Sequence, residues 1–153
     1  MPAVTRLIIS SVAGGAHQPL VAYLERWLPQ ALLLVRAAPP ALSIALVGDT
    51  RMAALHEKFL HVPGSTDVLT FALEDLRGRV TTGEVVVCVP FARREAKRRG
   101  LKLEQELLLY ALHGTLHLSG YDDRTPADHA RMHTEEDRIL QQLGIGPVFQ
   151  QEQ

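Results

Sequence analysis

Two histidines four residues apart, followed closely by two aspartates, are the side chains of this sequence best suited to chemistry. His113 and His117 lie at the end of a strongly apolar run that predicts an α-helix. Residues four apart share one face of a helix, so the two imidazoles should project side by side. Gly120 predicts the end of the helix, because glycine enters the left-handed backbone conformation without penalty. The chain can then turn back and carry Asp122 and Asp123 toward the imidazoles.

Two histidines and a carboxylate are the protein ligands of a catalytic zinc site. Three protein ligands leave a fourth position open for water, and zinc lowers the pKa of that water from about 15.7 to about 7. A lone His-x3-His pair also occurs as ordinary buried or surface histidines. The glycine stop followed at once by acidic residues favours the metal site, and the residues alone leave open which aspartate completes it.

The elements that must position these residues follow from hydrophobic periodicity and turn residues. We expect strands over residues 5–11, 41–47, 66–71 and 80–89. We expect helices over residues 18–37, 51–60, 90–99, from 103 through the histidine pair, and 126–143. This order predicts an α/β (α+β) fold with a mixed four-stranded sheet and about five helices. The helix that carries the two histidines should be largely buried.

Length and composition predict one soluble globular domain over residues 1–153, with 46% hydrophobic and 22% charged residues. The single cysteine, Cys88, excludes an internal disulfide and fits a reducing cytosol, and its apolar neighbours predict a small buried core residue. We find neither a secretory signal nor the roughly 20 uninterrupted apolar residues of a membrane span. We therefore expect a cytoplasmic protein that does not enter a membrane.

The formal net charge of −1 gives no global support for nucleic-acid binding, so any RNA contact needs a local basic patch. Six basic residues stand in ten positions: Arg93, Arg94, Lys97, Arg98, Arg99 and Lys102. They fit either a solvated helix face or an electrostatic track for RNA phosphates, whose binding would weaken with salt. The candidate RNA contacts are Arg93, Arg94, Lys97 and Arg98.

A second His-x3-His pair, His129 and His133, lies in the last expected helix. No glycine stop and no third ligand follow it closely in the sequence. A solvated or packing role is therefore favoured over a second metal site.

Residues 113–123 resemble the signature of the YbeY family of bacterial endoribonucleases, which act in ribosomal RNA maturation. In that family a His-x3-His-x5-His motif binds zinc, and the third of these positions is Asp123 here. The resemblance implies one zinc ion per chain, held by His113, His117 and Asp123. An anionic ligand should leave the bound water less acidic than a third imidazole would, although carboxylate oxygen is an accepted zinc ligand at about 2.0–2.2 Å.

The resemblance extends to residues 66–71, to the Gly83-Glu84 strand, and to Met132 and Glu136 in the last helix. It implies a single α/β or α+β domain that acts with ribosomal RNA and the small ribosomal subunit. The implied function is that of a zinc-dependent, single-strand-specific endoribonuclease in ribosomal RNA maturation and ribosome quality control.

The sequence departs from the family pattern at two positions before the 66–71 strand. Leu60 and His56 stand where the family carries an arginine and an asparagine. In the family the arginine is thought to contact phosphate, which leucine cannot do; Arg51 or Lys58 could compensate. Leu60 thus favours one alternative, a non-catalytic ribosome-assembly factor with a structural metal.

A metallohydrolase acting on a small molecule or a peptide is another alternative. However, the His-Glu-x-x-His peptidases carry their general base between the histidines, and no glutamate lies between His113 and His117. A plain structural domain with fortuitous histidines is the last alternative.

Overall fold

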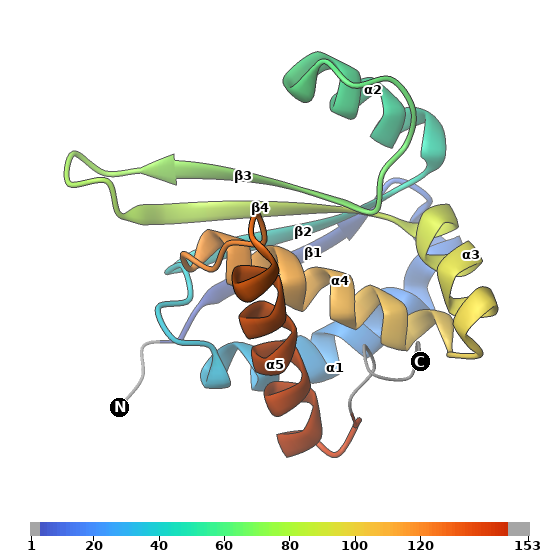
Figure 1. Ribbon diagram of the computed structural model, residues 1–153. Coiled ribbons are helices and arrows are strands. Elements are labelled where there is room, and N and C mark those ends of the chain that lie inside the picture. Colours follow the sequence, from blue (N-terminus) through green and yellow to red (C-terminus); the bar gives the residue numbers. More distant parts are fainter. Residues whose placement is uncertain (1–3, 147–153) are drawn as a thin grey trace.

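Four strands form one mixed sheet, in the order β1-β2-β4-β3, in the computed structural model, which describes residues 4–146 (Figure 1). The strands are β1 (Arg6–Ser11), β2 (Ala41–Val47), β3 (Val68–Glu74) and β4 (Val80–Cys88). β1, β2 and β4 run parallel, whereas β3 forms an antiparallel hairpin with β4. β1 and β3 are therefore the two edges of the sheet.

Residues 4–146 also form five α-helices and one short 3-10 helix. They are η1 (Gly14–His17), α1 (Gln18–Leu34), α2 (Asp49–Leu60), α3 (Val89–Arg99), α4 (Leu103–Leu118) and α5 (Pro126–Gln142). α4 packs against β3 and β4, α1 packs against β1, and α5 crosses α4 on the side away from the sheet, while α2 lies on the opposite side of the sheet (Figure 1). Among residues 4–146, no helix is both long enough and apolar enough to span a lipid bilayer.

The predicted α/β (α+β) class, the mixed four-stranded sheet and the five helices are confirmed, with boundaries shifted by two or three residues in the first helix, the second helix and the third strand. The first helix ends at Leu34 because Val35 takes an extended backbone conformation and is buried. The third strand begins at Val68, two residues later than predicted, because the Asp67 carboxylate accepts the Val68 backbone N–H at 2.7 Å and shapes a turn. It continues to Glu74 because the hairpin pairs Glu74 with Val80.

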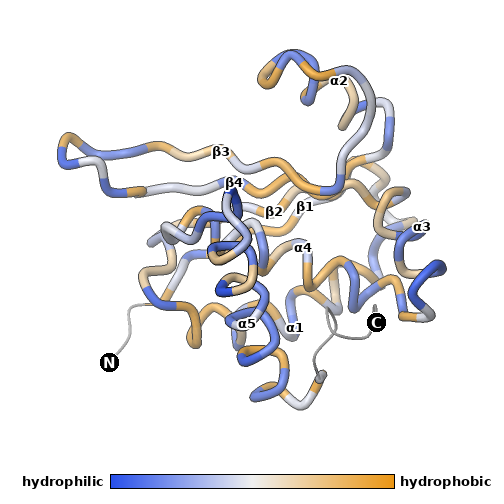
Figure 2. The backbone as a smooth tube through the Cα atoms, viewed as in Figure 1, coloured by the Kyte–Doolittle hydropathy of each residue, from blue (hydrophilic) through white to orange (hydrophobic). Residues whose placement is uncertain are grey.

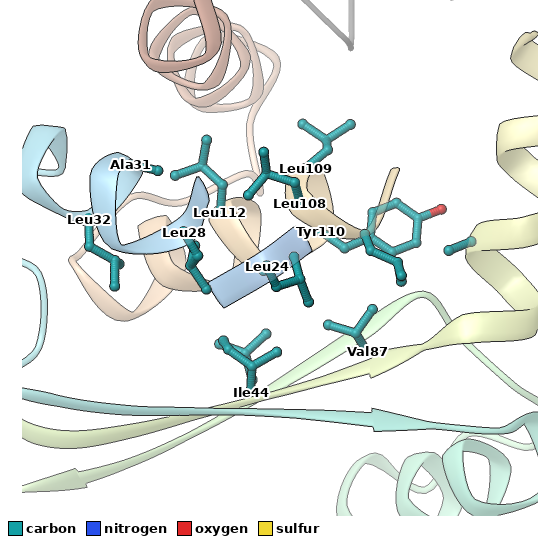
Figure 3. Packing of buried hydrophobic residues seen from close by; sticks show 14 of the residues in the cluster. Leu24, Leu28, Ala31, Leu32, Ile44, Val87, Leu108, Leu109, Tyr110 and Leu112 are labelled. Atoms are coloured by element: carbon teal, nitrogen blue, oxygen red, sulfur yellow. The ribbon is translucent and has the colours of Figure 1, made fainter. Parts of the chain in front are cut away.

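The core lies between the sheet and the layer formed by α1 and α4. Leu24 and Leu28 of α1 gather with Leu108 and Leu112 of α4 on one face of the sheet, near Ile44 of β2 (Figure 3). Burying a leucine of this kind contributes about 1.5–3 kcal/mol. Cys88 is fully buried in a smaller apolar cluster, as its neighbours predicted. The far end of α3, by contrast, is hydrophilic (Figure 2).

Gly114 lets α4 approach β4 closely. A Cβ atom at this position would lie 2.6 Å from Cγ1 of Val85 and 3.2 Å from Cγ2 of Thr70. These neighbours are β-branched side chains fixed on strands, so they cannot move aside cheaply. The glycine therefore sets the depth of α4 on the sheet, one residue after His113.

We predict that Gly114→Ala lowers the free energy of unfolding by about 1–2 kcal/mol. Overpacking costs about 1–3 kcal/mol, and the better helix propensity of alanine recovers at most about 1 kcal/mol. Urea denaturation measures the change. Gly15→Ala is the control, because no heavy atom lies within 4 Å of its Cβ position. A Gly114→Ala protein as stable as the wild type would contradict the close packing.

Candidate metal centre

The last turns of α4 and the loop after them bring three ligand atoms together. His113 and His117 lie one turn apart on α4, and their rings meet edge to face at 4.8 Å. Gly120 takes a φ of 105°, and the Tyr121 N–H bonds back to the Leu116 carbonyl at 3.0 Å. This reversal carries Asp123 back to the two rings.

The geometry of this cluster fits a single divalent ion. Oδ2 of Asp123 lies 3.4 Å from Nε2 of His117 and 3.7 Å from Nε2 of His113. All three ligand atoms lie within 4.8 Å of one another. Ligands of a tetrahedral zinc site, with bonds of about 2.0–2.2 Å, lie about 3.3 Å apart. Small side-chain adjustments would therefore close the three atoms around one ion.

Asp122, the other aspartate of the motif, is occupied by the turn itself. Its carboxylate accepts the Asp123 N–H at 2.7 Å and the Arg124 Nε–H at 2.7 Å. These bonds lower the pKa of Asp122, the hydrogen bond from Arg124 most of all. Asp122 thus shapes the loop that presents Asp123.

Glu136 of α5 holds His113 from the other end of the ring. Its side chain is fully buried, and Oε2 lies 2.9 Å from Nδ1 of His113. Ligating histidines commonly donate their second ring N–H to a carboxylate, which fixes the ring and raises its basicity. The sequence had indicated Glu136 only as a match to a family position, without a role.

Burial and hydrogen bonding have opposite effects on the pKa values of His113 and Glu136. Burial lowers the pKa of His113, but the hydrogen bond from its ring to Glu136 and the nearby negative charges raise that pKa above its ordinary value. Burial raises the pKa of Glu136, but the hydrogen bonds from His113 and His133 bring it below its ordinary value. Glu136 is therefore a carboxylate at neutral pH.

The second histidine pair, His129 and His133, lies beside Glu136 and lines the same cavity as His113. Nδ1 of His133 lies 2.5 Å from the other oxygen of Glu136, and its Nε2 lies 3.0 Å from Nε2 of His129. The His133 ring stacks beside His113, with centroids 6.0 Å apart. The pair thus reaches the candidate centre through Glu136, a contact that sequence spacing did not predict.

Two cavities meet at the cluster. The first, about 360 Å³, is lined mainly by ionisable side chains, and the candidate ligands His113 and Asp123 share it with Arg98 and Glu95. The second, about 340 Å³, is more apolar and lies along β3. It is lined by all three candidate ligands and by Phe59, Leu60, Thr70 and Phe71, among others. A chain that crosses the cluster would thus meet a polar wall on one side and an apolar wall on the other.

The four candidate RNA contacts on α3 occupy different surroundings. Arg98 lines the polar cavity, where it also pairs with Glu95 at 2.7 Å. Arg94 forms two bonds to Asp49, at 2.9 and 3.1 Å, which lower the pKa of Asp49 to about 2. Arg93 and Lys97 are exposed on α3 and line neither cavity. Only Arg98 of the four lies beside the cluster.

Arg99, the next basic residue, is buried against Glu106 at 2.6 Å. Its charge is neutralised inside the fold, so it supports the structure rather than an RNA track.

Leu60, at the end of α2, is 55% exposed and lines the apolar cavity together with the candidate ligands. Lys58 lies with its Nζ 5.3 Å from the ring centre of Phe59, and Arg51 lines a separate groove. Neither cation lines the two cavities at the cluster. The wall that Leu60 forms is thus apolar.

Comparison with known proteins gives a consistent result. The profile of the family described as Endoribonuclease YbeY matches residues 16–144. A protein of that name from Thermobifida fusca is 38% identical over 134 residues, covering 82% of this chain and 84% of the relative. Another from Desulfitobacterium hafniense is 34% identical over 145 residues, covering 88% and 92%. A third, from Mycobacterium ulcerans, is 35% identical over 111 residues, covering 66% of this chain and 62% of its own.

Among solved structures, the solution structure of TM1509 from Thermotoga maritima matches with a TM-score of 0.54 and 24% identity. The match covers 93% of this chain and 94% of that chain. This likeness concerns the fold.

We predict that zinc binding weakens as the pH falls. A proton and the ion compete for Nε2 of His113, whose raised pKa keeps it protonated at higher pH than an ordinary histidine. Affinity is full above that pKa and falls about tenfold per pH unit below it for each competing proton. Competition with a chromophoric chelator between about pH 8 and pH 5.5 measures the change, with circular dichroism as the control for folding. An affinity independent of pH over this range would contradict His113 as a ligand.

Proposed function

The chain belongs to the YbeY family of endoribonucleases, and from this premise we propose that it is a hydrolase that cleaves RNA in ribosomal RNA processing. In finer terms, we propose a zinc-dependent, single-strand-specific endoribonuclease in ribosomal RNA maturation and ribosome quality control. Its partners would be ribosomal RNA and the small ribosomal subunit, in the cytoplasm. The observation that carries the proposal is the His113, His117 and Asp123 cluster at the meeting point of two cavities.

The three side chains of the cluster would hold the ion. Nε2 of His113, Nε2 of His117 and Oδ2 of Asp123 face one another and would hold one divalent ion. When bound there, zinc supplies an acidified water and a Lewis acid for a phosphoryl oxygen.

The polar wall supplies the positive charge for a phosphate. Arg98 lies in the cavity that contains His113 and Asp123, where its guanidinium can donate to phosphate oxygens. Glu95 holds that guanidinium at 2.7 Å and limits its reach. Arg98 is thus the α3 cation that we assign to the RNA strand, with Arg93, Arg94 and Lys97 contributing at longer range.

One observation favours a second candidate function. Leu60 places an apolar side chain, without charge, on the wall beside the cluster. A non-catalytic ribosome-assembly factor with a structural metal would tolerate such a wall. It would associate with RNA or ribosomes and would not cleave purified RNA in a metal-dependent way.

We predict that His117→Ala lowers zinc affinity more than about 100-fold and abolishes RNA cleavage. Loss of a partner in the outer shell of a metal site already costs about 10–100-fold in affinity, and loss of a direct ligand costs more. Elemental analysis of untagged protein gives zinc per chain, and a labelled single-stranded RNA with and without chelator gives cleavage. His56→Asn is the control, because His56 bonds to the Gly64 carbonyl and lines neither cavity at the cluster. Equal zinc in wild type and His117→Ala would refute the site.

Leu60→Arg should strengthen RNA binding by adding one phosphate contact beside the cluster. One contact to a single strand steepens the slope of log K against log salt by about 0.7. Fluorescence anisotropy with a single-stranded RNA at several salt concentrations measures the slope. Leu73→Arg makes the same charge change at an exposed position of β3 that lines neither cavity. The same increase in slope in both variants would contradict a phosphate contact beside the cluster, because the added charge would then act equally well at either position.

A further inference from the structure

A hydrogen-bonded chain runs from the candidate ligand His113 to the surface of α5. Nδ1 of His113 lies 2.9 Å from Oε2 of Glu136, and Oε1 of Glu136 lies 2.5 Å from Nδ1 of His133. Nε2 of His133 then lies 3.0 Å from Nε2 of His129, which is exposed. Four side chains are thus linked by three contacts in one line.

The two nitrogens of His113 face different partners. Nε2 points to Oδ2 of Asp123 and to the place of the ion, while Nδ1 points to Glu136. A metal-bound imidazole uses the lone pair of one nitrogen and keeps its proton on the other. The chain therefore fixes His113 as an Nδ1–H donor, with the lone pair of Nε2 directed at the ion.

Glu136 determines which atoms donate and which accept in the other hydrogen bonds of this series. A carboxylate accepts and does not donate, so His133 must carry its proton on Nδ1. In its neutral form His133 then accepts on Nε2, and His129 donates from its own Nε2. When the histidines are neutral, each ring therefore has one tautomer that satisfies all three contacts.

One face of α5 carries all three supporting residues. His129 and His133 are four residues apart, and Glu136 follows three residues later, so they lie on adjacent turns of the same face. Met132 and Ile139, on the same helix, are fully buried in the core and hold that face in place. The support is therefore built on a rigid element, which is what precise ligand placement requires.

We propose that Glu136, His133 and His129 are positioning residues for the metal ligand His113. Glu136 fixes the ring and its tautomer, His133 fixes Glu136 through its Nδ1–H, and His129 sets the tautomer of His133. The imidazole pair on α5 thus supports the cluster of His113, His117 and Asp123. Among the described residues, the three side chains placed closely enough to hold one metal ion are His113, His117 and Asp123, and the α5 pair is not among them.

The experiment compares two substitutions of His133 that differ in one hydrogen bond. His133→Asn keeps a donor at the place of Nδ1, whereas His133→Leu removes it and keeps a side chain of similar size. We expect His133→Leu to weaken zinc binding about tenfold and Glu136→Gln about 10–100-fold. His133→Asn should stay close to the wild type, and His129→Ala should fall between His133→Asn and His133→Leu.

Three readouts separate positioning from general stability. Chelator competition gives the zinc dissociation constant, and the visible spectrum of the cobalt-substituted protein reports the ligand geometry. Thermal unfolding of the metal-free proteins shows whether a variant is merely less stable. We expect the cobalt spectrum to change in His133→Leu and Glu136→Gln and to be retained in His133→Asn.

Several outcomes would overturn the proposal. Wild-type zinc affinity and cobalt spectrum in both Glu136→Gln and His133→Leu would show that the chain does not position the ligand. Equal losses in His133→Asn and His133→Leu would assign His133 to packing. Zinc held by His129 and His133, lost in His129→Ala but kept in His117→Ala, would make the α5 pair a metal site of its own. The proposal rests on the metal site of the proposed function, and RNA cleavage tells the two apart. Wild-type protein that binds zinc without cleaving RNA would refute the nuclease, while the zinc affinities and cobalt spectra of the variants would still decide the positioning role.

Discussion

The close approach of α4 to the sheet at Gly114 is the constraint on which the candidate centre depends. No Cβ fits between the helix and Val85, so α4 lies deep, with His113 and His117 at the edge of the packed layer. From that depth His113 reaches Glu136 on α5, while both Nε2 atoms face the loop that returns from Gly120. The packing of an apolar helix thereby fixes the directions of two polar rings.

Charge is arranged around this helix end in a way that suits a cation. One carboxylate, Asp123, faces the imidazoles from the loop, and a second, Glu136, lies fully buried behind His113. A buried carboxylate is costly unless it is paired and hydrogen-bonded. The two histidines that bond to Glu136 meet this need, and a divalent ion would add the balancing charge. Two of the five basic residues of α3 pair with carboxylates away from the cluster: Arg94 with Asp49 and Arg99 with Glu106.

Local patterns in the sequence predicted what local physics decides. The 3.6-residue period, the glycine stop at Gly120 and the runs of β-branched residues gave the order of strands and helices, and the placement of His113 beside His117. Contacts between distant segments could not be predicted in this way. Glu136 lies 23 residues after His113, and Asp49 lies 45 residues before Arg94. Which carboxylate meets which partner depends on how α5 crosses α4 and how α2 meets α3, and no periodicity encodes these crossings.

The most direct test of the account is the location of the ion itself. Crystals of the untagged protein grown with zinc, measured on both sides of the zinc absorption edge, would give an anomalous difference map. We predict one peak per chain, about 2.0–2.2 Å from Nε2 of His113, Nε2 of His117 and a carboxylate oxygen of Asp123. A protein fully loaded with zinc whose only peak lay elsewhere, for example between His129 and His133, would contradict the central claim.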